Sequence, residues 1–211
     1  MSRRPDGRIA GWPVLLAGLV AVGLTAVRPS GQLSAQVSVH IGAGARYGTA
    51  LIRDSIVVPI ELRPAIAPTL LLSVHDDLRG PWTADATLDV TPTPLRRYES
   101  GTTFDVGSVT TIAFTVGLRR TFSSGITARF AIGGLAYAGS DDGPFRDGSG
   151  LMPVGSVAAS YEISGFAVEA RYDVHRFITR ALQDMRFNNP RPVHRVALGV
   201  SRRVIGKGGR E

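Results

Sequence analysis

Apolar and polar side chains alternate strictly along several stretches of this 211-residue chain, and this pattern constrains the fold more than any other feature. In residues 166–177, FAVEARYDVHRF, the apolar Phe166 and Val168 alternate with the ionisable Glu169 and Arg171. Successive side chains of a β-strand leave on opposite faces, so a strand separates the two sets, whereas a helix would mix them. The stretch is therefore predicted to be a strand with one apolar and one charged face.

The same period of two recurs along the chain, and no segment after residue 36 keeps a helical periodicity. We therefore predict an all-β chain with eight strands, at residues 37–47, 64–76, 82–91, 104–121, 126–139, 151–163, 166–178 and 193–205. The limits of the second strand stay open, because LLL at residues 70–72 breaks the alternation. The preceding IVVPIEL fits either an extension of that strand or a loop.

Residues 1–35 have the order of a secretory signal peptide. Three arginines among the first eight residues precede an apolar run at residues 12–27, and a small-residue site follows at residues 33–35. The alternative is a single transmembrane anchor, but the apolar run is shorter than the ~20 residues that usually span a bilayer. We expect cleavage near Ala35, which leaves residues 36–205 as one folded domain and residues 206–211 as a short basic tail.

The chain has no cysteine, so its exported form must be stabilised by burial and hydrogen bonding rather than by disulfide bonds. Its net charge is +7, of which +3 comes from the four arginines and one aspartate of residues 1–35. The remaining excess of positive charge is mild and is poor evidence for a nucleic-acid partner. We therefore expect no nucleic acid among its partners.

The connections between the predicted strands are alternately short and long. Short turns rich in Gly, Ser and Pro fall at residues 77–81, 122–125 and 164–165, and longer segments fall at residues 48–63, 92–103, 140–150 and 179–192. An even number of strands with short turns at one end and long loops at the other is typical of outer-membrane barrels. A soluble lipocalin-like barrel also has eight strands, but nothing requires its hairpins to alternate in length.

The two faces of the predicted strands differ in side-chain size. The polar faces are rich in Gly, Ala, Ser and Thr, whereas the apolar faces carry Val, Ile, Leu and Phe. An eight-stranded barrel has an interior just wide enough for its own side chains, so small residues belong inside and large apolar residues outside. A lipocalin needs the reverse. We predict an eight-stranded antiparallel up-and-down transmembrane β-barrel after an N-terminal signal peptide.

With its signal peptide, eight alternating strands and short and long connections, the chain resembles the small outer-membrane β-barrel family typified by outer-membrane proteins A and X. The resemblance covers residues 37–205 and is one of pattern, without a residue-specific motif. It implies an outer-membrane location, contact with outer-membrane lipid and lipopolysaccharide, and insertion by the barrel-assembly machinery. We expect a monomer with no cofactor and no metal. One departure is the end of the chain, VALGVSRRVIGKGGRE, where the family usually has a terminal aromatic residue.

Twelve ionisable side chains fall on the predicted inner face. They are Arg46, Asp85, Asp89, Asp105, Arg119, Arg129, Glu162, Glu169, Arg171, Asp173, His175 and Arg195. Six carboxylates stand against five arginines, so nearly all of these charges can pair. An unpaired buried charge costs about 3 to 5 kcal/mol. We predict a structural network that closes the lumen rather than a conducting pore, because porins have ~16 strands.

Two pairs of residues on shared faces raise the question of catalysis: Asp173 with His175, and Ser73 with His75. Catalysis would need a nucleophile, a base within hydrogen-bond reach and an orienting third group, and no His-x-Ser pair of the deacylase type occurs in the sequence. We expect a non-enzymatic barrel with a structural or surface-interaction role. The alternatives are a lipid-A-modifying outer-membrane enzyme and, less favoured, a soluble lipocalin-like barrel that binds a ligand.

Two groups of residues in the predicted external loops suggest ligands. The loop GSDDGPFRDGSG contains Asp141, Asp142 and Asp147 but lacks the ligand spacing of a calcium loop, so a solvated tip is expected. Five loop arginines are candidate contacts for lipopolysaccharide phosphates, although ordinary solvated charge explains them equally well. They are Arg96, Arg97, Arg180, Arg186 and Arg191.

Overall fold

A computed structural model describes residues 37–54, 60–139, 149–177 and 192–206; the predicted signal peptide and residues 207–211 of the basic tail lie outside these ranges. The described residues form ten antiparallel strands. These are β1 (Val37–Gly48), β2 (Ile52–Asp54), β3 (Ile60–Pro64), β4 (Ala67–Asp77), β5 (Trp82–Glu99), β6 (Thr102–Thr121), β7 (Ile126–Ala138), β8 (Met152–Ile163), β9 (Phe166–Arg176) and β10 (Pro192–Ile205). Among the described residues, no helix is long and apolar enough to cross a membrane.

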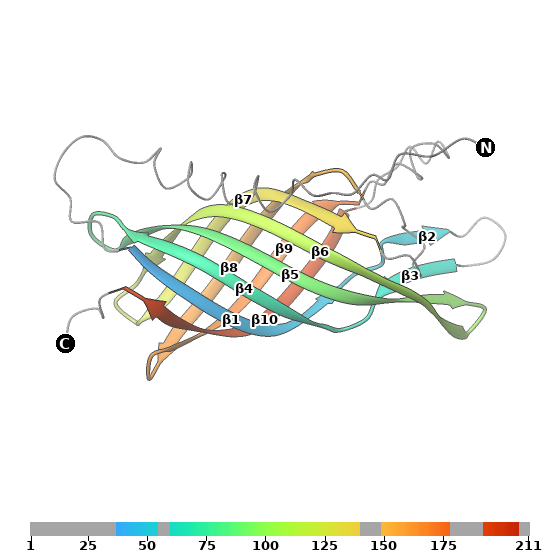
Figure 1. Cartoon of the computed structure of the whole chain (residues 1–211), viewed down its shortest axis with the longest axis horizontal. Coiled ribbons are helices and arrows are strands. Elements are labelled where there is room, and N and C mark those ends of the chain that lie inside the picture. The colour runs from blue at the N-terminus through green and yellow to red at the C-terminus, as the bar shows by residue number, and fades with distance from the viewer. Residues whose placement is uncertain (1–36, 55–59, 140–148, 178–191, 207–211) are drawn as a thin grey trace, which may run out of the picture. The chain divides into compact units, whose positions relative to one another are not determined.

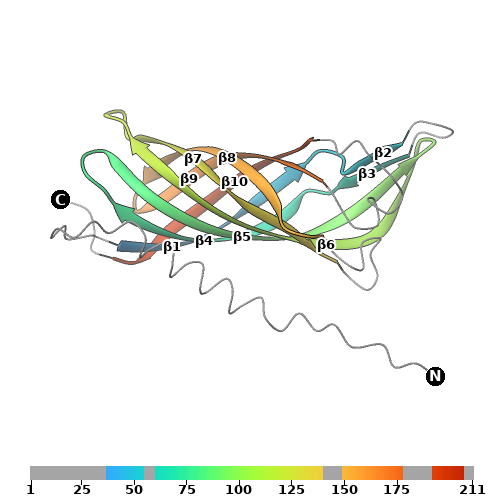
Figure 2. The same ribbon diagram turned by 90° about the horizontal axis from the view of Figure 1, so that it is seen from above.

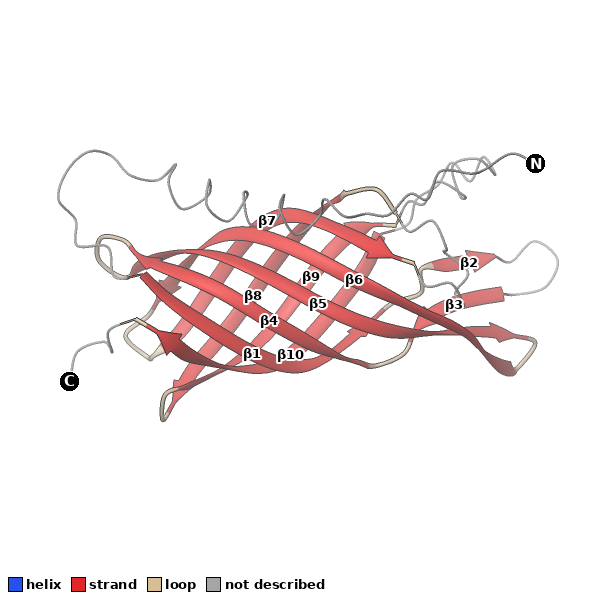
Figure 3. Cartoon of the chain, viewed as in Figure 1, coloured by secondary structure: helices blue, strands red, loops and turns tan. Residues whose placement is uncertain are grey.

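Eight of these strands close into a ring in the order β1-β4-β5-β6-β7-β8-β9-β10. The ring closes where β1 pairs with β10, from Val39 opposite Ile205 to Gly48 opposite Arg195. Figures 1 and 3 show the ring strands running obliquely around a common interior. The predicted eight-stranded up-and-down barrel is confirmed, with each ring strand adjacent to the next one along the chain.

One end of the barrel holds the β4–β5, β6–β7 and β8–β9 turns together with the start of β1 and the end of β10, and we call it the short-turn end. Val37, at the start of β1, is opposite Asp76 of β4, and β10 finishes beside the same end of β1. The β8–β9 turn has positive φ at both central residues, 52° at Ser164 and 80° at Gly165, as the tightest hairpins require. Figure 2 shows the barrel from the side that faces up in Figure 1.

The β5–β6 hairpin is much longer than predicted. Residues 92–103, predicted to be a long external loop, instead continue both strands to a two-residue turn at Ser100 (φ 46°) and Gly101 (φ 83°). This prediction is wrong, because β5 continues through Pro92 and Pro94. A proline is tolerated in a strand where its missing N–H has no ladder partner.

Those prolines also explain why β5 changes its neighbour. The β4–β5 ladder ends at Leu70 opposite Val90, and β3 then pairs with β5 from Pro64 opposite Leu95. The carbonyl of Pro94 accepts a hydrogen bond from the backbone N–H of Ala65 (2.9 Å), so the donor-free side of Pro94 faces this boundary. The β4–β5 ladder cannot continue where proline supplies no backbone N–H donor, and β3 replaces β4 as the neighbour of β5.

Beyond the ring, β2, β3 and the distal ends of β5 and β6 form a four-stranded sheet in the order β2-β3-β5-β6. We call this sheet, with residues 52–54, 60–64, 95–99 and 102–106, the extension. Figure 1 shows it at the opposite end of the barrel from the β4–β5 turn. The predicted connection 48–63 is therefore partly ordered as strand, whereas residues 55–59 lie outside the described part.

The outer face of the ring is apolar. Large hydrophobic side chains point outward from every ring strand, and many are largely exposed, including Ile132 at 72%, Phe130 at 66% and Leu198 at 61%. A contiguous apolar surface of this extent is unstable in water, and lipid is the solvent that matches it. The predicted outward orientation of the apolar face is confirmed.

Aromatic and arginine side chains mark the short-turn end of this apolar surface. The guanidinium of Arg120 lies 5.4 Å from the ring of Trp82 and 5.3 Å from that of Phe122. Arg202 lies 5.4 Å from the ring of Phe166. Aromatic rings with adjacent cations are enriched where a membrane protein meets lipid headgroups, so these residues mark one border of the apolar surface.

Two inward-facing glycines show how tightly neighbouring strands are packed. A Cβ atom at Gly133 would lie 1.9 Å from the carbonyl oxygen of Phe114, and one at Gly44 would lie 2.4 Å from that of Leu198. Because both obstacles are backbone atoms, no side-chain movement relieves them. Small residues on the inner face are thus required by the wall itself as well as by the narrow interior.

Depth in the membrane gives a test of the outer face within one strand. Ile126 and Ile132 lie on the same face of β7, Ile126 next to the Phe122–Gly125 turn and Ile132 at the middle of the strand. Replacing Ile132 with arginine should cost about 2 to 4 kcal/mol of unfolding free energy, and replacing Ile126 about 0 to 1 kcal/mol. Urea unfolding in lipid vesicles measures both. Equal costs at the two positions would contradict a membrane-spanning barrel.

Candidate functional site

The interior of the barrel contains most of the ionisable residues that the alternation predicted to face inward. Ten of the twelve are buried, each with at most 9% of its surface exposed. They are Arg46, Asp85, Asp89, Arg119, Arg129, Glu169, Arg171, Asp173, His175 and Arg195. The side chains come from β1, β5, β6, β7, β9 and β10, and they meet because inward positions of every ring strand converge on one narrow space.

Asp89 is the centre of the first half of this interior. Arg46 binds it with both terminal nitrogens, Nη1 donating to Oδ1 over 2.7 Å and Nη2 to Oδ2. The Thr91 hydroxyl donates to Oδ1 (3.0 Å), and Nη1 of Arg171 donates to Oδ2 (3.4 Å). Arg46 also lies 3.4 Å from a carboxylate oxygen of Asp173. Bidentate arginine–carboxylate pairs of this kind fix orientation as well as charge.

Asp85 is the centre of the second half. The guanidinium of Arg129 donates to it through Nε (2.8 Å) and also reaches the hydroxyls of Thr115 (2.8 Å) and Ser156 (3.3 Å). Arg129 is only 1% exposed, so these bonds replace the water it would otherwise bind. Arg119 lies 3.6 Å from the other Asp85 oxygen.

Glu169 connects the two halves. It accepts from Nη2 of Arg119 (3.0 Å) and from Nε (3.1 Å) and Nη2 (2.6 Å) of Arg171. Because Arg171 also reaches Asp89, the contacts are continuous from Arg46 to Arg129. We call these side chains, with Arg195, the charge network; its members are Arg46, Asp85, Asp89, Arg119, Arg129, Glu169, Arg171, Asp173 and Arg195.

Asp105 was predicted to face the lumen, and this prediction is wrong. On β6, Val106 and Gly107 together oppose one residue of β5, a β-bulge in which Gly107 has φ 91°. One extra residue reverses which side chains face inward. Val106 therefore packs against the buried core, and the Asp105 side chain is 85% exposed on the extension.

Glu162 was also predicted to belong to the lumen, and it too is exposed. It follows Ser160 on the inward face of β8, but it lies one residue from the end of the strand, beside the Ser164–Gly165 turn. Its face was predicted correctly, and its depth was not. A carboxylate at the rim of the barrel is hydrated by solvent and needs no buried partner.

The histidine pairs are arranged differently from a catalytic triad. The Tyr137 hydroxyl lies 2.8 Å from Nε2 of His175, whereas the Asp173 carboxylate contacts Arg46. At the short-turn end, the His75 ring stacks on that of His40 at 4.1 Å, and Ser38 Oγ lies 3.1 Å from Nε2 of His40. Within the described residues, no carboxylate is hydrogen-bonded to His40, so the orienting third group is not supplied there.

An apolar cluster that was not predicted from the sequence fills the interior at the extension end. Leu95, Leu135 and Val193 have no exposed surface, and Tyr137 packs edge-on against Phe177 with ring centres 5.0 Å apart. We call this cluster the apolar plug; its buried members are Leu51, Leu62, Leu95, Val109, Ala113, Leu135, Tyr137, Met152, Val154, Phe177 and Val193. The alternation itself could have found much of it, because counting in twos from Arg129 gives Leu135 and Tyr137.

The candidate lipopolysaccharide contacts divide into two groups. Arg96 and Arg97 lie on β5 rather than in a loop, and each faces a carboxylate: Arg96 is 3.6 Å from Asp105, and Arg97 is 3.3 Å from Glu99. Arg180, Arg186, Arg191 and the aspartates of residues 141–147 lie outside the described residues. In the part of the chain that the structure describes, no group of three or more His, Cys, Asp or Glu is placed to hold a metal ion.

On the extension, Glu61 is held between two arginines. Arg53 donates to one carboxylate oxygen from Nε (2.9 Å), and Arg63 lies against the other, with its guanidinium 5.4 Å from the Tyr98 ring. Partial burial alone would raise the pKa of Glu61, but the hydrogen bonds from Arg63 and Arg53 outweigh it and lower the pKa below its usual value. Glu61 thus stays ionised in a surface where positive and negative groups balance.

No protein-family model and no curated protein matches the sequence. Several solved outer-membrane barrels are similar in structure at low identity. Ail of Yersinia pestis, in complex with the heparin analogue sucrose octasulfate, is 12% identical with a TM-score of 0.49, over 82% of this chain and 100% of that chain. AlkL in lipid bilayers is 13% identical with a TM-score of 0.49, over 87% and 98%. OprG of Pseudomonas aeruginosa is 8% identical with a TM-score of 0.47, over 81% and 96%.

The charge network makes a quantitative prediction at Arg171, which connects its two halves. Replacing Arg171 with methionine leaves Glu169 and Asp89 each short of a buried partner, and should lower the unfolding free energy in lipid by about 3 to 5 kcal/mol. Adding Glu169→Gln should restore part of the loss, because the excess negative charge disappears.

The matched control is Arg53→Met, which removes an arginine from the exposed pair with Glu61 and should cost at most about 1 kcal/mol. Urea unfolding of Arg171→Met, Glu169→Gln, the double variant and Arg53→Met provides the comparison. Strict additivity of the Arg171 and Glu169 changes, each with a cost as small as that of Arg53→Met, would mean that the two residues are not coupled.

Proposed function

We propose that the mature chain is an outer-membrane barrel with a structural or surface-interaction role and without enzymatic activity. The observation that carries this proposal is the filled interior: the charge network occupies its middle and the apolar plug its extension end. Such packing argues against a continuous water path and against a substrate bound inside the barrel. The function of such a protein would then depend on the surfaces that it exposes outside the bilayer.

The proposed location rests on the chain's own features. A predicted export signal precedes a closed ring whose outer face is apolar, and barrels of this kind span outer membranes. Lipid and lipopolysaccharide would then surround the ring, and the barrel-assembly machinery would insert it. The extension would face outward, because the opposite end of the barrel holds the start of β1, the end of β10 and the β4–β5, β6–β7 and β8–β9 turns.

The extension is the part of the described structure best suited to meet a partner. It presents four arginines together with two aromatic rings, Tyr98 and Phe104, each of which lies beneath a guanidinium. All four arginines are already paired with carboxylates, through Glu61, Glu99 and Asp105. A lipopolysaccharide phosphate would have to compete with these pairs, so we propose general surface contact rather than a dedicated phosphate site.

Epitope insertion tests the location and the orientation together. A tag inserted after Gly101, at the tip of the β5–β6 hairpin, should be bound by antibody on intact cells. The same tag inserted after Ser124, in the β6–β7 turn, should be bound only after the outer membrane has been permeabilised. Binding of the Ser124 tag on intact cells would reject the proposed orientation, and binding of neither tag before complete lysis would reject the location.

Two separate experiments test the proposed lack of enzymatic activity and of ion conduction, one on lipid A and one on the purified barrel. Lipid A from cells that express the chain should have the same mass spectrum as lipid A from cells that express the Ser38→Ala variant. The purified barrel in planar bilayers should show no steps of ion conductance. A lipid A change that disappears in Ser38→Ala would establish the enzyme, and steady conductance would contradict the filled interior.

A further inference from the structure

One member of the charge network is poorly compensated. Arg195 is 4% exposed, and neither of its terminal nitrogens has a hydrogen-bond partner among the described residues. Its contact with the network is a 3.9 Å approach of Nη2 to Oδ1 of Asp89. That oxygen already accepts from Arg46 and Thr91 at much shorter distances, 2.7 and 3.0 Å. Asp89 therefore has little capacity left for Arg195.

The balance of charge points the same way. The network contains five arginines and four carboxylates, so it carries one positive charge in excess. The exposed positions of Asp105 and Glu162 remove the two carboxylates that sequence alone would have added. An uncompensated charge in a buried site is strongly destabilising, and arginine cannot lose its proton to avoid it.

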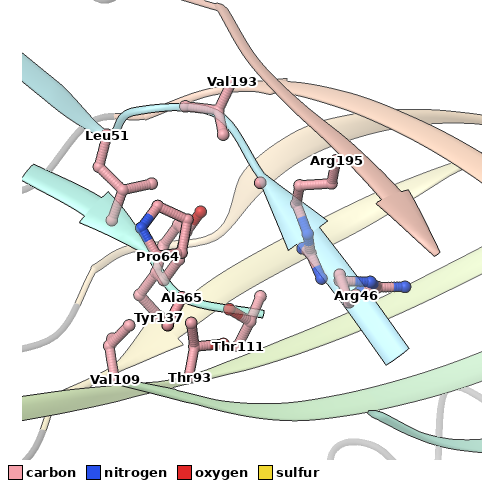
Figure 4. A pocket seen from close by; sticks show the side chains of 11 residues that line it. Arg46, Leu51, Pro64, Ala65, Thr93, Val109, Thr111, Tyr137, Val193 and Arg195 are labelled. Atoms are coloured by element: carbon pink, nitrogen blue, oxygen red, sulfur yellow. The ribbon is translucent and has the colours of Figure 1, made fainter. Parts of the chain in front are cut away.

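A cavity lies beside the poorly compensated arginine. It has a volume of ≈ 20 Å³ and lies where the charge network meets the apolar plug. Arg195 and Arg46 line one side, and Thr111, Val109 and Tyr137 line another; Figure 4 shows the two arginines on neighbouring strands next to this space. The site thus combines guanidinium donors with a hydroxyl and with apolar walls.

We propose that this cavity binds one small monovalent anion of the size of chloride, held by Arg195 with help from Arg46. A single water needs about 10 to 15 Å³ of cavity volume, so this cavity has room for one species of about that size. Water would supply acceptors for the Arg195 nitrogens but no charge, whereas a halide supplies both. The anion would complete the pairing that Asp89 leaves unfinished.

The test uses halide dependence of stability. The full barrel in lipid vesicles is unfolded and refolded in urea at fixed pH and ionic strength, with sodium bromide replacing sodium gluconate, whose anion is too large for the cavity. If bromide binds the folded state alone, the unfolding constant should fall about 100-fold at a bromide concentration 100 times the dissociation constant. Arg195→Gln should remove this dependence, while Arg96→Gln, on the exposed extension, should retain it.

A second measurement does not depend on any variant folding. Crystals of the unaltered protein soaked in sodium bromide should show an anomalous scattering peak within hydrogen-bond distance of Arg195. Bromide-independent stability of the unaltered protein, or soaked crystals without a peak in the cavity, would overturn the proposal and assign the site to water. Retained bromide dependence in Arg195→Gln would equally overturn it, because the anion would then bind elsewhere.

Discussion

When eight strands close into a ring, the backbone N–H and C=O groups of each strand form hydrogen bonds with the neighbouring strands, so the ring has no free edge. The space inside is then only as wide as the inward-facing side chains. The remaining features follow from that limit. Neighbouring strands approach so closely that only glycine fits at position 133, beside the Phe114 carbonyl. Large apolar residues are displaced to the outer face, where Ile132 and Phe130 are largely exposed. A surface of that kind then requires lipid.

The same limit explains why the charges form one network rather than separate pairs. Each of the carboxylates Asp85, Asp89 and Glu169 contacts two or more arginines, because a narrow interior brings side chains from distant strands within reach. Networks of this kind add little net stability compared with apolar packing. Their effect is on register: a slip of one residue on any contributing strand would turn its charge toward lipid and leave the partners unpaired inside. The network therefore helps to specify which strand positions face each other.

The sequence could predict which side chains face inward but not which of them meet. Counting in twos along a strand finds Arg119 and Glu169, yet their contact joins β6 and β9 across the interior and depends on the size and tilt of the ring. The alternation fails at the bulge formed by Val106 and Gly107, which turns the Asp105 side chain outward. It also gives no depth, which is why Glu162 was placed in the lumen.

The length of β5 could not be predicted for a different reason. Pro92 and Pro94 argue against a strand, because a proline has no backbone N–H to donate to a neighbouring strand. They are tolerated in β5 because β4 ends beside them, and the sequence alone does not show where that neighbour ends. The turn beyond them did carry a local signal, since Ser100-Gly101 repeats the Ser164-Gly165 dipeptide of a turn that was predicted correctly. The sequence of the turn was therefore recognisable, whereas its position in the sheet could not be predicted.

The two layers of the interior have separate consequences for what the barrel can do. The apolar plug lies on the extension side of the charge network, so it limits the amount of water that reaches the ion pairs from that end. Ion pairs and hydrogen bonds are stronger in such a dry environment, and unpaired charges there are correspondingly more costly. Substitutions on the exposed face of the extension should therefore leave intact the ion pairs that set the register of the ring.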